Sequence, residues 1–597
     1  MKLSDYVVEF IAGLGVKHVF MLPGGGAMHL NDSLGKCHSL QYVCNLHEQG
    51  GAIAAEAYGQ YAGLGVLMVT TGPGGTNAIT GVAGAWLEST PMLVVSGQVK
   101  RADLVGNRGV RQIGFQEIDI VSVVNPITKF AAIVTDPNQI RRCLEEAAWK
   151  ATHGRKGPVW VDIPLDVQAS EIDPQNLEGF TPPKADPNQD SRIQAAVLKT
   201  LELLSNAKRP VVLVGNGVRH AGAIDLFLKW VESIGIPVLT TWKALDFLPE
   251  DHPLYVGRPG AVGQRAANFS QQTSDLFINL GARLDYGQTA YNHRNFAPRA
   301  RKVVVDIDPA EIAKLDMESA VPLVADVGAF LVSLADSTKN LSHPNWGAWR
   351  QRCMAWKARY PIVQESYRTV PSGVHNYMLV DTLGRLLGSG DILRPGSSGA
   401  CSEVTSQAVP VSKGLRFINT HGLGAMGFGV PAALGACLAS SGKRTVCIDG
   451  DGGFPMNSQE LAVISRLKLP IKFFILNNGG YGSIRATQVN YFERRFVACD
   501  PRSGLTFPDI QKTAEACNVT YCRIISQDNL PGDVANVLNS SGPVVCEVLI
   551  SPDQFTQPRV SSKQQPNGKL VTMPMEDLWP FIDRDELDAN LQVEDPE

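Results

Sequence analysis

Length, composition and charge exclude several classes of protein. The chain has 597 residues, 44% hydrophobic and 19% charged, with 57 glycines and 37 prolines, which indicates about three globular α/β domains and not a disordered or fibrous chain. The net charge of −4 gives no basic field, so nucleic acid is not expected as a partner. Isolated cysteines, an N-terminus with early acidic residues and the lack of a long apolar run predict a reduced, cytoplasmic protein with no membrane partner.

Short β-branched segments alternate with helical patterns along the chain, which predicts parallel sheets built from βαβ units. Examples of the predicted strands are 66–71, 91–97, 158–164, 210–215, 275–281, 302–308, 445–450 and 472–478. Residues 169–190 are rich in Pro, Asp and Asn and predict a linker. A second seam, 337–372, carries three tryptophans that suggest a linker helix on a domain surface: Trp346, Trp349 and Trp356.

The predicted fold class is therefore α/β, with three doubly wound parallel-sheet domains. We expect these domains at 1–170, 190–336 and 373–550. Residues 551–597, rich in Pro, Gln and acidic side chains, are expected to form a tail that wraps or caps the domains.

Two strand ends in the third predicted domain carry a candidate metal site. One strand leads into Asp451, and the next leads into Asn478 and Gly480. The carboxyl ends of neighbouring parallel strands open a crevice for a ligand, and these oxygen donors suit Mg²⁺ shared with phosphate. Three glycines would let the backbone approach that phosphate: Gly450, Gly452 and Gly453. Two ordinary βα turns are the alternative, which the position at two strand ends disfavours.

Longer motifs extend over nearly the whole chain. They include NLHEQGGAIAAEAYG, TTGPGGTN, THGLGAMGFGVPAALGA and GDGGFPMNSQE followed by ILNNGGYGSI. Together they resemble thiamine-diphosphate-dependent enzymes of the acetohydroxyacid synthase type, whose three domains bind the pyrimidine ring, FAD and the diphosphate with Mg²⁺. The resemblance implies that Asp451, Asn478 and the Gly480 carbonyl hold Mg²⁺. It implies thiamine diphosphate contacts at Gly399, Ala400, Gly424, Met426, Gly450, Asp451, Gly452, Gly453, Asn478, Gly480, Tyr481 and Gly482.

The same resemblance implies two catalytic residues, Glu48 and Gln116, and a departure from it, His29 where the synthases carry proline, adds a third candidate. A glutamate placed like Glu48 hydrogen-bonds the aminopyrimidine ring and supports loss of a proton from the thiazolium, a role that needs a carboxylic acid in a dry pocket. The alternative is a helix-capping or ion-paired glutamate. Gln116 matches a glutamine that faces the reacting centre, and His29 would relay a proton or be a structural histidine. Met426 would lie beneath the thiazolium, unless it is an ordinary core methionine.

The middle of the chain resembles the FAD-binding segments of those synthases. The motifs are VGNGV, TTWKALDFLP, GARLD, VVVDID and ADV. A structural FAD would be held by Arg155, Gly215, Gly217, Thr241, Gly281, Arg283, Asp306, Ile307 and Asp326. Arg283 would meet the phosphate or ribitol, and the two aspartates would face the adenosine end. The alternative is a domain of the same fold that has lost its flavin.

Two departures from the synthases concern the second substrate. Gly287 stands where an arginine holds the acceptor's carboxylate, and Thr487 stands where a tryptophan narrows the acceptor site. In PGGGAMHLND, Gly26 also replaces a usual alanine. This pattern is similar to FAD-containing carboligases of branched-chain deoxysugar (yersiniose-type) biosynthesis, which transfer an acetyl unit to a nucleotide-bound keto sugar.

The predicted function is therefore decarboxylation of pyruvate and transfer of its two-carbon unit to a ketone or aldehyde acceptor. Acetolactate synthesis from two pyruvates is the first alternative, and a diketone hydrolase or decarboxylase is the second. A catalytically silent scaffold is the third, although it would need no such combination of Glu48, Asp451 and Asn478. The resemblance also implies a homodimer or homotetramer with active sites between subunits.

Overall fold

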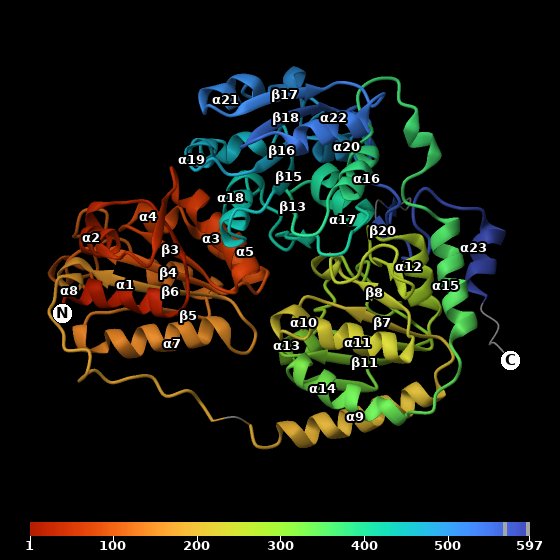
Figure 1. The fold of residues 1–597 in the computed structure, drawn as a ribbon, viewed down its shortest axis with the longest axis horizontal. Coiled ribbons are helices and arrows are strands. Elements are labelled where there is room, and N and C mark those ends of the chain that lie inside the picture. Colours follow the sequence, from red (N-terminus) through yellow and green to blue (C-terminus); the bar gives the residue numbers. More distant parts are fainter. Residues whose placement is uncertain (185, 565–566, 568–569, 593–597) are drawn as a thin grey trace.

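The structure is a computed structural model that describes residues 1–184, 186–564, 567 and 570–592. Five residues of the predicted tail, 593–597, and four in its middle, 565–566 and 568–569, lie outside the described residues. Three parallel six-stranded sheets with flanking helices confirm the predicted fold class (Figure 1). Within the described part of the chain, no helix combines the length and apolar character needed to cross a membrane.

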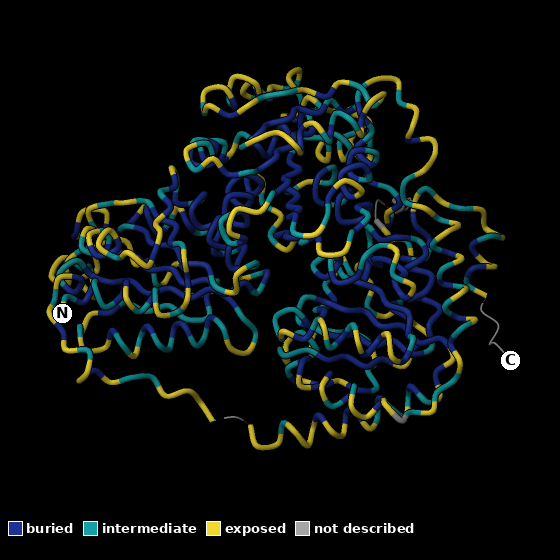
Figure 2. Tube along the Cα trace, in the orientation of Figure 1, coloured by how far each residue is buried: buried dark blue, intermediate teal, exposed yellow. Residues whose placement is uncertain are grey.

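The first sheet has the strand order β2-β1-β3-β4-β6-β5. Its strands are β1 (His18–Met21), β2 (Gln41–Cys44), β3 (Gly65–Val69), β4 (Met92–Gln98), β5 (Phe130–Ile133) and β6 (Pro158–Pro164). Its helices are α1 (Leu3–Gly13), α2 (Met28–Lys36), α3 (Glu48–Ala62), α4 (Pro73–Thr76), α5 (Ile79–Leu87), α6 (Ile120–Val124), α7 (Ile140–Thr152) and α8 (Leu165–Gln168). The central strands are wholly buried (Figure 2), as expected for a parallel sheet covered on both faces.

The second sheet has the order β12-β11-β10-β7-β8-β9. Its strands are β7 (Pro210–Val214), β8 (Val238–Thr240), β9 (Tyr255–Gly257), β10 (Leu276–Leu280), β11 (Arg301–Asp306) and β12 (Val321–Val324). Its helices are α9 (Gln189–Asn206), α10 (Gly217–His220), α11 (Ile224–Ile234), α12 (Arg265–Thr273), α13 (Pro309–Ala313) and α14 (Val327–Ser337). Between α8 and α9, the described residues 169–184 and 186–188 lie along one side of the molecule (Figure 1).

The third sheet has the order β14-β13-β15-β16-β18-β17. Its strands are β13 (Ile392–Pro395), β14 (Arg416–Phe417), β15 (Thr445–Gly450), β16 (Ile471–Asn477), β17 (Thr520–Ile524) and β18 (Val544–Leu549). Its helices are α16 (Asn376–Leu386), α17 (Val404–Ala408), α18 (Gly429–Ala439), α19 (Glu460–Arg466), α20 (Gly482–Tyr491), α21 (Ile510–Ala516) and α22 (Leu530–Asn539). A short π-helical turn, η8 (Gly399–Glu403), precedes α17.

The second seam contains the predicted helix, α15 (Gly347–Arg359), which packs against α12 beside the second sheet (Figure 1). Its tryptophans are buried: the indole of Trp349 donates to the Pro210 carbonyl at 3.0 Å, and that of Trp356 donates to Asn590 at 2.8 Å. Asn590 belongs to α23 (Arg584–Leu591) of the tail, which also contains a hairpin of β19 (Ser562–Gln564) and β20 (Leu570–Thr572). The described part of the tail therefore covers the second sheet's helices.

Helices α3 and α18 join the first and third sheets. Small residues line their contact, and a Cβ on Gly435 would lie 1.9 Å from the Ala54 carbonyl oxygen, so only glycine permits this approach. Near the start of α3, the Glu460 carboxylate of α19 accepts from Asn45 Nδ2 at 2.9 Å and from the Leu46 N–H at 3.0 Å. These contacts fix the first residue of α3, Glu48, relative to the third sheet.

Candidate cofactor sites

Asp451, Asn478 and Gly480 lie together at the ends of β15 and β16. The strands pair in parallel with Gly450 opposite Leu476, so both chains leave the sheet at the same edge. The N–H of Gly480 donates to Asp451 Oδ2 at 3.1 Å and to Asn478 Oδ1 at 3.2 Å. Burial raises the pKa of Asp451 to about 6, against the opposing effect of hydrogen bonds from the Gly480 N–H and its neighbours. A cation beside this carboxylate would favour its ionised form.

The glycines around this turn have different physical roles. A Cβ on Gly452 would lie 2.5 Å from the Tyr481 ring, and one on Gly453 would lie 2.6 Å from Asp449 Oδ1. A Cβ on Gly480 would meet the Cys499 carbonyl oxygen at 2.0 Å. Of these four glycines, Gly450 is the one where a Cβ would meet ordinary contacts, with Cys401 Sγ at 3.7 Å nearest. Gly450 therefore has open space beside it, whereas the others allow close packing of the turn.

The turn η8 lies against the same strand end. Gly399 faces Ser483 of α20 and Glu403, since its Cβ would lie 3.3 Å from Ser483 Oγ. Ser398 caps the turn by accepting from the Cys401 N–H at 3.2 Å. Ala400 is half-buried beside these residues. Tyr481 and Gly482 begin α20, so the predicted diphosphate-binding residues of these segments share one edge of the third sheet.

Glu48 is the first residue of α3 and is buried. Its Oε2 accepts from Asn77 Nδ2 at 3.0 Å, which ties it to the TTGPGGTN loop. The same loop meets Gln116, because a Cβ on Gly72 would lie 2.2 Å from the Gln116 carbonyl oxygen. Gln116 itself is exposed and has a φ of +64°. The structure thus brings Glu48 and Gln116 to one loop.

His29 and Met426 are placed differently. His29 is half-buried in the first turn of α2, and among the described residues no hydrogen bond joins it to Glu48 or Gln116. Met426 is 41% exposed and follows Gly424, which has a φ of +61°. Asn457 Nδ2 donates to the carbonyl oxygen of neighbouring Gly427 at 2.8 Å and to Gln49 at 3.3 Å. This amide links the Met426 segment to the start of α3.

The predicted alanine-to-glycine departure at Gly26 has a steric cause. A Cβ there would lie 1.8 Å from the Thr71 hydroxyl, which donates to the Gly97 carbonyl at 3.1 Å. The Gly26 N–H in turn donates to Thr70 Oγ1 at 3.1 Å. An alanine at this position would have to displace Thr71 from its hydrogen bond.

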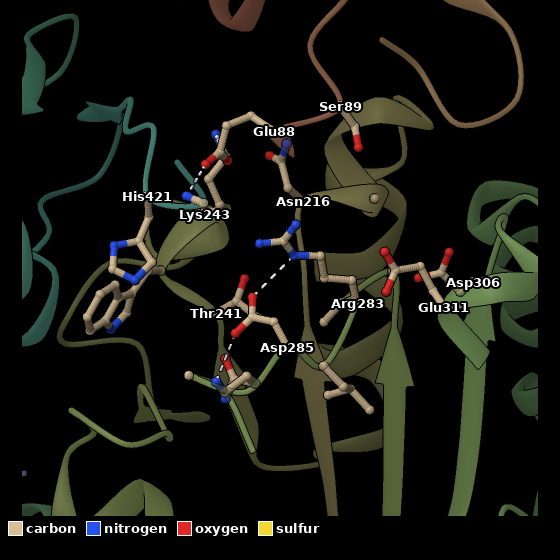
Figure 3. A pocket seen from close by; sticks show the side chains of 18 of the residues that line it. Glu88, Ser89, Asn216, Thr241, Lys243, Arg283, Asp285, Asp306, Glu311 and His421 are labelled. Carbon is tan, nitrogen blue, oxygen red and sulfur yellow. Dashed lines mark hydrogen bonds and ion pairs between the residues drawn. The ribbon is translucent and has the colours of Figure 1, made fainter. Parts of the chain in front are cut away.

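A cavity of about 810 Å³ lies where the three sheet domains and the tail meet. Eight of the nine residues predicted to bind FAD line it: Arg155, Gly217, Thr241, Gly281, Arg283, Asp306, Ile307 and Asp326. Figure 3 shows Asp306 and Glu311 on one side of this cavity, Lys243 and His421 on the other, and Arg283 between them. Its volume falls in the range of ligand pockets, about 300–1,000 Å³.

The ninth residue, Gly215, is used for packing and is absent from the described lining. A Cβ on Gly215 would lie 2.3 Å from the Gly281 carbonyl oxygen, and one on Gly217 would lie 2.8 Å from Gly281 Cα. These three glycines therefore let the turns after β7 and β10 touch. Gly281 also has a φ of +63°, which favours glycine.

The charged residues of the cavity already have protein partners. Arg155 contacts Asp308 at 2.8 Å and Glu311 at 2.6 Å, and Arg283 contacts Asp285 at 3.2 Å. Asp326 Oδ1 caps α14 by accepting from the Gly328 N–H at 2.9 Å. Burial raises the pKa of Asp306.

Sequence reasoning missed Glu88 and Lys243, which form an ion pair of 2.9 Å at this cavity (Figure 3). The Gly422 N–H donates to Glu88 Oε1 at 2.5 Å. Beside them, Trp242 and His421 pack edge to face with ring centroids 4.5 Å apart. The available signal was a lysine inside the TTWKALDFLP motif and a glutamate just before β4.

The donor set at Asp451 fits a hard cation better than a soft one. The described residues contain no group of three or more His, Cys, Asp or Glu side chains placed to hold a metal ion. The carboxylate and amide oxygens at Asp451 and Asn478 instead resemble a magnesium site that shares its ligands with a phosphate.

Comparisons with known proteins identify the class. The chain matches the thiamine pyrophosphate enzyme N-terminal TPP binding domain over residues 1–123, the central domain over 197–334 and the C-terminal TPP binding domain over 397–548. The chain belongs to the thiamine pyrophosphate (thiamine diphosphate) enzyme family.

Its relatives include acetolactate synthases. The large subunit from Lactococcus lactis subsp. lactis (strain IL1403) is 33% identical over 567 residues, covering 93% of this chain and 94% of the relative. The large subunit from Corynebacterium glutamicum (strain ATCC 13032) is 35% identical over 608 residues, covering 100% and 93%. The chloroplastic enzyme of Arabidopsis thaliana is 33% identical over 577 residues, covering 94% and 83%. The chain is therefore an acetolactate synthase-like, thiamine-diphosphate-dependent enzyme.

The two predicted acceptor residues lie in different places. Gly287 is exposed and lines the 810 Å³ cavity, and its carbonyl accepts from the Ala261 N–H at 2.8 Å. Thr487 is exposed on α20, where its hydroxyl donates to the Ser483 carbonyl at 3.1 Å, and it is not part of the described cavity lining.

Proposed function

We propose that the chain decarboxylates pyruvate and transfers the two-carbon unit to a carbonyl acceptor. The observation that carries this proposal is the convergence of Asp451 and Asn478 oxygens on the Gly480 N–H within a C-terminal TPP binding domain. Asp451, Asn478 and the Gly480 carbonyl would hold Mg²⁺ beside the diphosphate. Thiamine diphosphate, when bound, supplies the electron sink for decarboxylation.

The protein's own groups then have three tasks. Glu48, buried and held by Asn77, would exchange a proton with the aminopyrimidine ring. Gln116, which reaches the same loop, would orient the substrate. Met426 would support the cofactor, since the positive φ of Gly424 turns the chain there and leaves the side chain partly exposed.

We propose FAD as a second, structural cofactor in the 810 Å³ cavity. Support comes from Arg283 and from the carboxylates of Asp306 and Asp326, which line one cavity together. Purified enzyme is expected to show flavin absorbance, and Arg283→Gln to lose most of it. Arg294→Gln serves as the control, because Arg294 is exposed and, among the described residues, its one ion pair is with Asp316. Equal flavin content in both variants would contradict the assignment.

The acceptor has two candidates. The comparisons favour a second pyruvate, giving acetolactate, because the relatives named above are acetolactate synthases. Gly287 and Thr487 favour a larger, neutral ketone such as a nucleotide-linked keto sugar, since neither residue offers a guanidinium or an indole. A diketone hydrolase remains the alternative in which no acceptor is needed.

Mass spectrometry of products separates these candidates. Pyruvate alone tests acetolactate formation, and pyruvate with a bulky neutral ketone tests formation of a tertiary alcohol. Acetolactate as the sole product would reject the larger acceptor. Absence of carbon–carbon bond formation from every pair, with thiamine diphosphate bound, would reject the carboligase proposal itself.

We further propose a homodimer or homotetramer with active sites between subunits. Support comes from the exposure of Gln116 and Met426 and from Phe115, which is 86% exposed. Inactive Glu48→Gln and Asp451→Asn chains, unfolded and refolded together, would then form hybrid dimers with one intact site. Random mixing of dimers gives about a quarter of wild-type activity. Activity no higher than that of either variant alone would place both residues in one subunit's site.

A further inference from the structure

A second cavity, of about 370 Å³, lies where the three sheet domains meet. It lies beside the larger cavity, and four residues line both: Lys156, Asn216, His220 and Lys243. The rest of its wall consists of the end of α3, residues 59–63, together with Pro91, Arg219 of α10, and Arg416 and Phe417 of β14. None of the predicted cofactor-binding residues is part of the described lining.

The walls of this cavity carry charge of one sign. Lys156, Arg219, Lys243 and Arg416 line it, and the described lining contains no carboxylate. The carboxylates that pair with these cations lie behind the wall. Asp246 contacts Arg219 at 2.6 Å and Arg416 at 2.9 Å, and Glu88 contacts Lys243 at 2.9 Å.

Three of the four cations thus pair directly with two carboxylates, and within the described part of the chain Lys156 has no ion pair. The Gln60 carbonyl at the end of α3 accepts from Arg416 at 3.0 Å, but a carbonyl has no net charge and leaves the excess positive charge unchanged. A cavity with low-dielectric walls and excess positive charge attracts anions.

Hydrogen-bond donors are also left over. The Lys156 ammonium has three donors, and within the described part of the chain its one hydrogen bond is to the His220 carbonyl at 2.9 Å. Arg219 donates to Asn216 Oδ1 at 3.0 Å, which leaves the Asn216 amide nitrogen to donate to His220 Nε2 at 2.9 Å. The proton of neutral His220 is then on Nδ1.

We propose that this cavity binds a small organic anion with at least two negative charges, a phosphate ester or a polycarboxylate. Its volume is near the lower end of the range for small-molecule pockets, about 300 Å³, and exceeds the need of one inorganic ion. The anion would lie between the end of α3, whose first residue is Glu48, and β14, which precedes the Met426 segment. Binding would therefore hold the three domains in one arrangement.

Isothermal titration calorimetry tests the site on the full chain saturated with thiamine diphosphate, Mg²⁺ and FAD, at constant ionic strength. The probes are inorganic phosphate and tricarballylate, which separate phosphate-type from polycarboxylate recognition. We expect one of them to bind saturably at one site per chain and to raise the melting temperature. Saturation by neither probe would overturn the proposal. Release of flavin or thiamine diphosphate would place the anion in a cofactor site and would also overturn it.

Two variants act from different sides of the cavity. Lys156→Gln removes a charge-assisted contact and is expected to weaken binding by about tenfold or more. Ala62→Phe fills the cavity from an exposed helix end and is expected to abolish binding. The matched control is Lys150→Gln, because Lys150 pairs with Glu146 at 2.7 Å outside the cavity. Wild-type affinity in either cavity variant, or an equal loss in the control, contradicts the assignment.

Discussion

Replacement of Gly452 by alanine tests the packing of the turn after β15. The new Cβ would lie 2.5 Å from the Tyr481 ring, about 1 Å inside normal carbon–carbon contact. Overpacking of this kind costs about 1–3 kcal/mol. Displacement of Tyr481 also moves the adjacent Gly480, and misplacement by about 1 Å lowers activity by about 10²-fold. We therefore expect loss of both stability and cofactor affinity.

The matched control is Gly450→Ala in the same turn, where the nearest atom would be Cys401 Sγ at 3.7 Å. Thermal melting without cofactors should show a decrease of about 2–10 °C for Gly452→Ala. The same measurement should show little change for Gly450→Ala. Calorimetry with thiamine diphosphate and Mg²⁺ then measures affinity for each. A wild-type melting temperature and wild-type affinity in Gly452→Ala would refute the steric argument.

Three further predictions concern buried charges. Glu48→Gln should lower kcat by about 10²-fold or more with an unchanged melting temperature, because glutamine still accepts from Asn77; near-normal turnover would exclude its proton-transfer role. Burial raises the pKa of Asp162 to about 7, so the folded state keeps a proton that the unfolded state loses above its normal pKa of 3.8. Stability from this group therefore falls by about 1.4 kcal/mol per pH unit between about pH 4 and pH 7, and Asp162→Asn should flatten that slope in denaturant titrations. Lys243→Met leaves Glu88 buried without its ion pair and should lower the free energy of unfolding by about 3–5 kcal/mol. The double variant that adds Glu88→Gln should recover part of this loss. An equal loss in the single and double variants would contradict the coupling between the two residues.

The strands that hydrophobic patterns reveal are those covered on both faces. Predicted strands 158–164, 210–215 and 445–450 correspond to β6, β7 and β15 within one residue, because each is a continuous buried run. No edge strand is among the examples that the sequence pattern provides. β14 has two residues and β9 has three, too few to show a pattern, and each forms by pairing with the strand beside it, β13 or β8.

Some features of the candidate site could likewise be predicted from the sequence and others could not. The strand ends at Asp451 and Asn478 could be predicted because parallel strands leave a sheet at one edge. The ion pair between Glu88 and Lys243 could not, since it joins two domains through residues far apart in the sequence. Gly215 was interpreted as an approach for a dinucleotide, but steric contact with the Gly281 backbone already requires glycine there. A glycine in the sequence does not by itself show whether it makes room for a ligand or for the backbone of a neighbouring turn.

The contact between α3 and α18 has a consequence for how the chain unfolds. One continuous apolar cluster contains Phe20 and Leu67 of the first sheet together with Leu434 of α18 and Phe473 of the third sheet. The second sheet has a separate cluster around Val212 and Ile278. The first and third domains share this cluster, so we expect them to unfold together. The three domains then form two cooperative unfolding units. Calorimetric scans should then resolve two transitions, and neither the first nor the third domain should persist as an independently folded fragment.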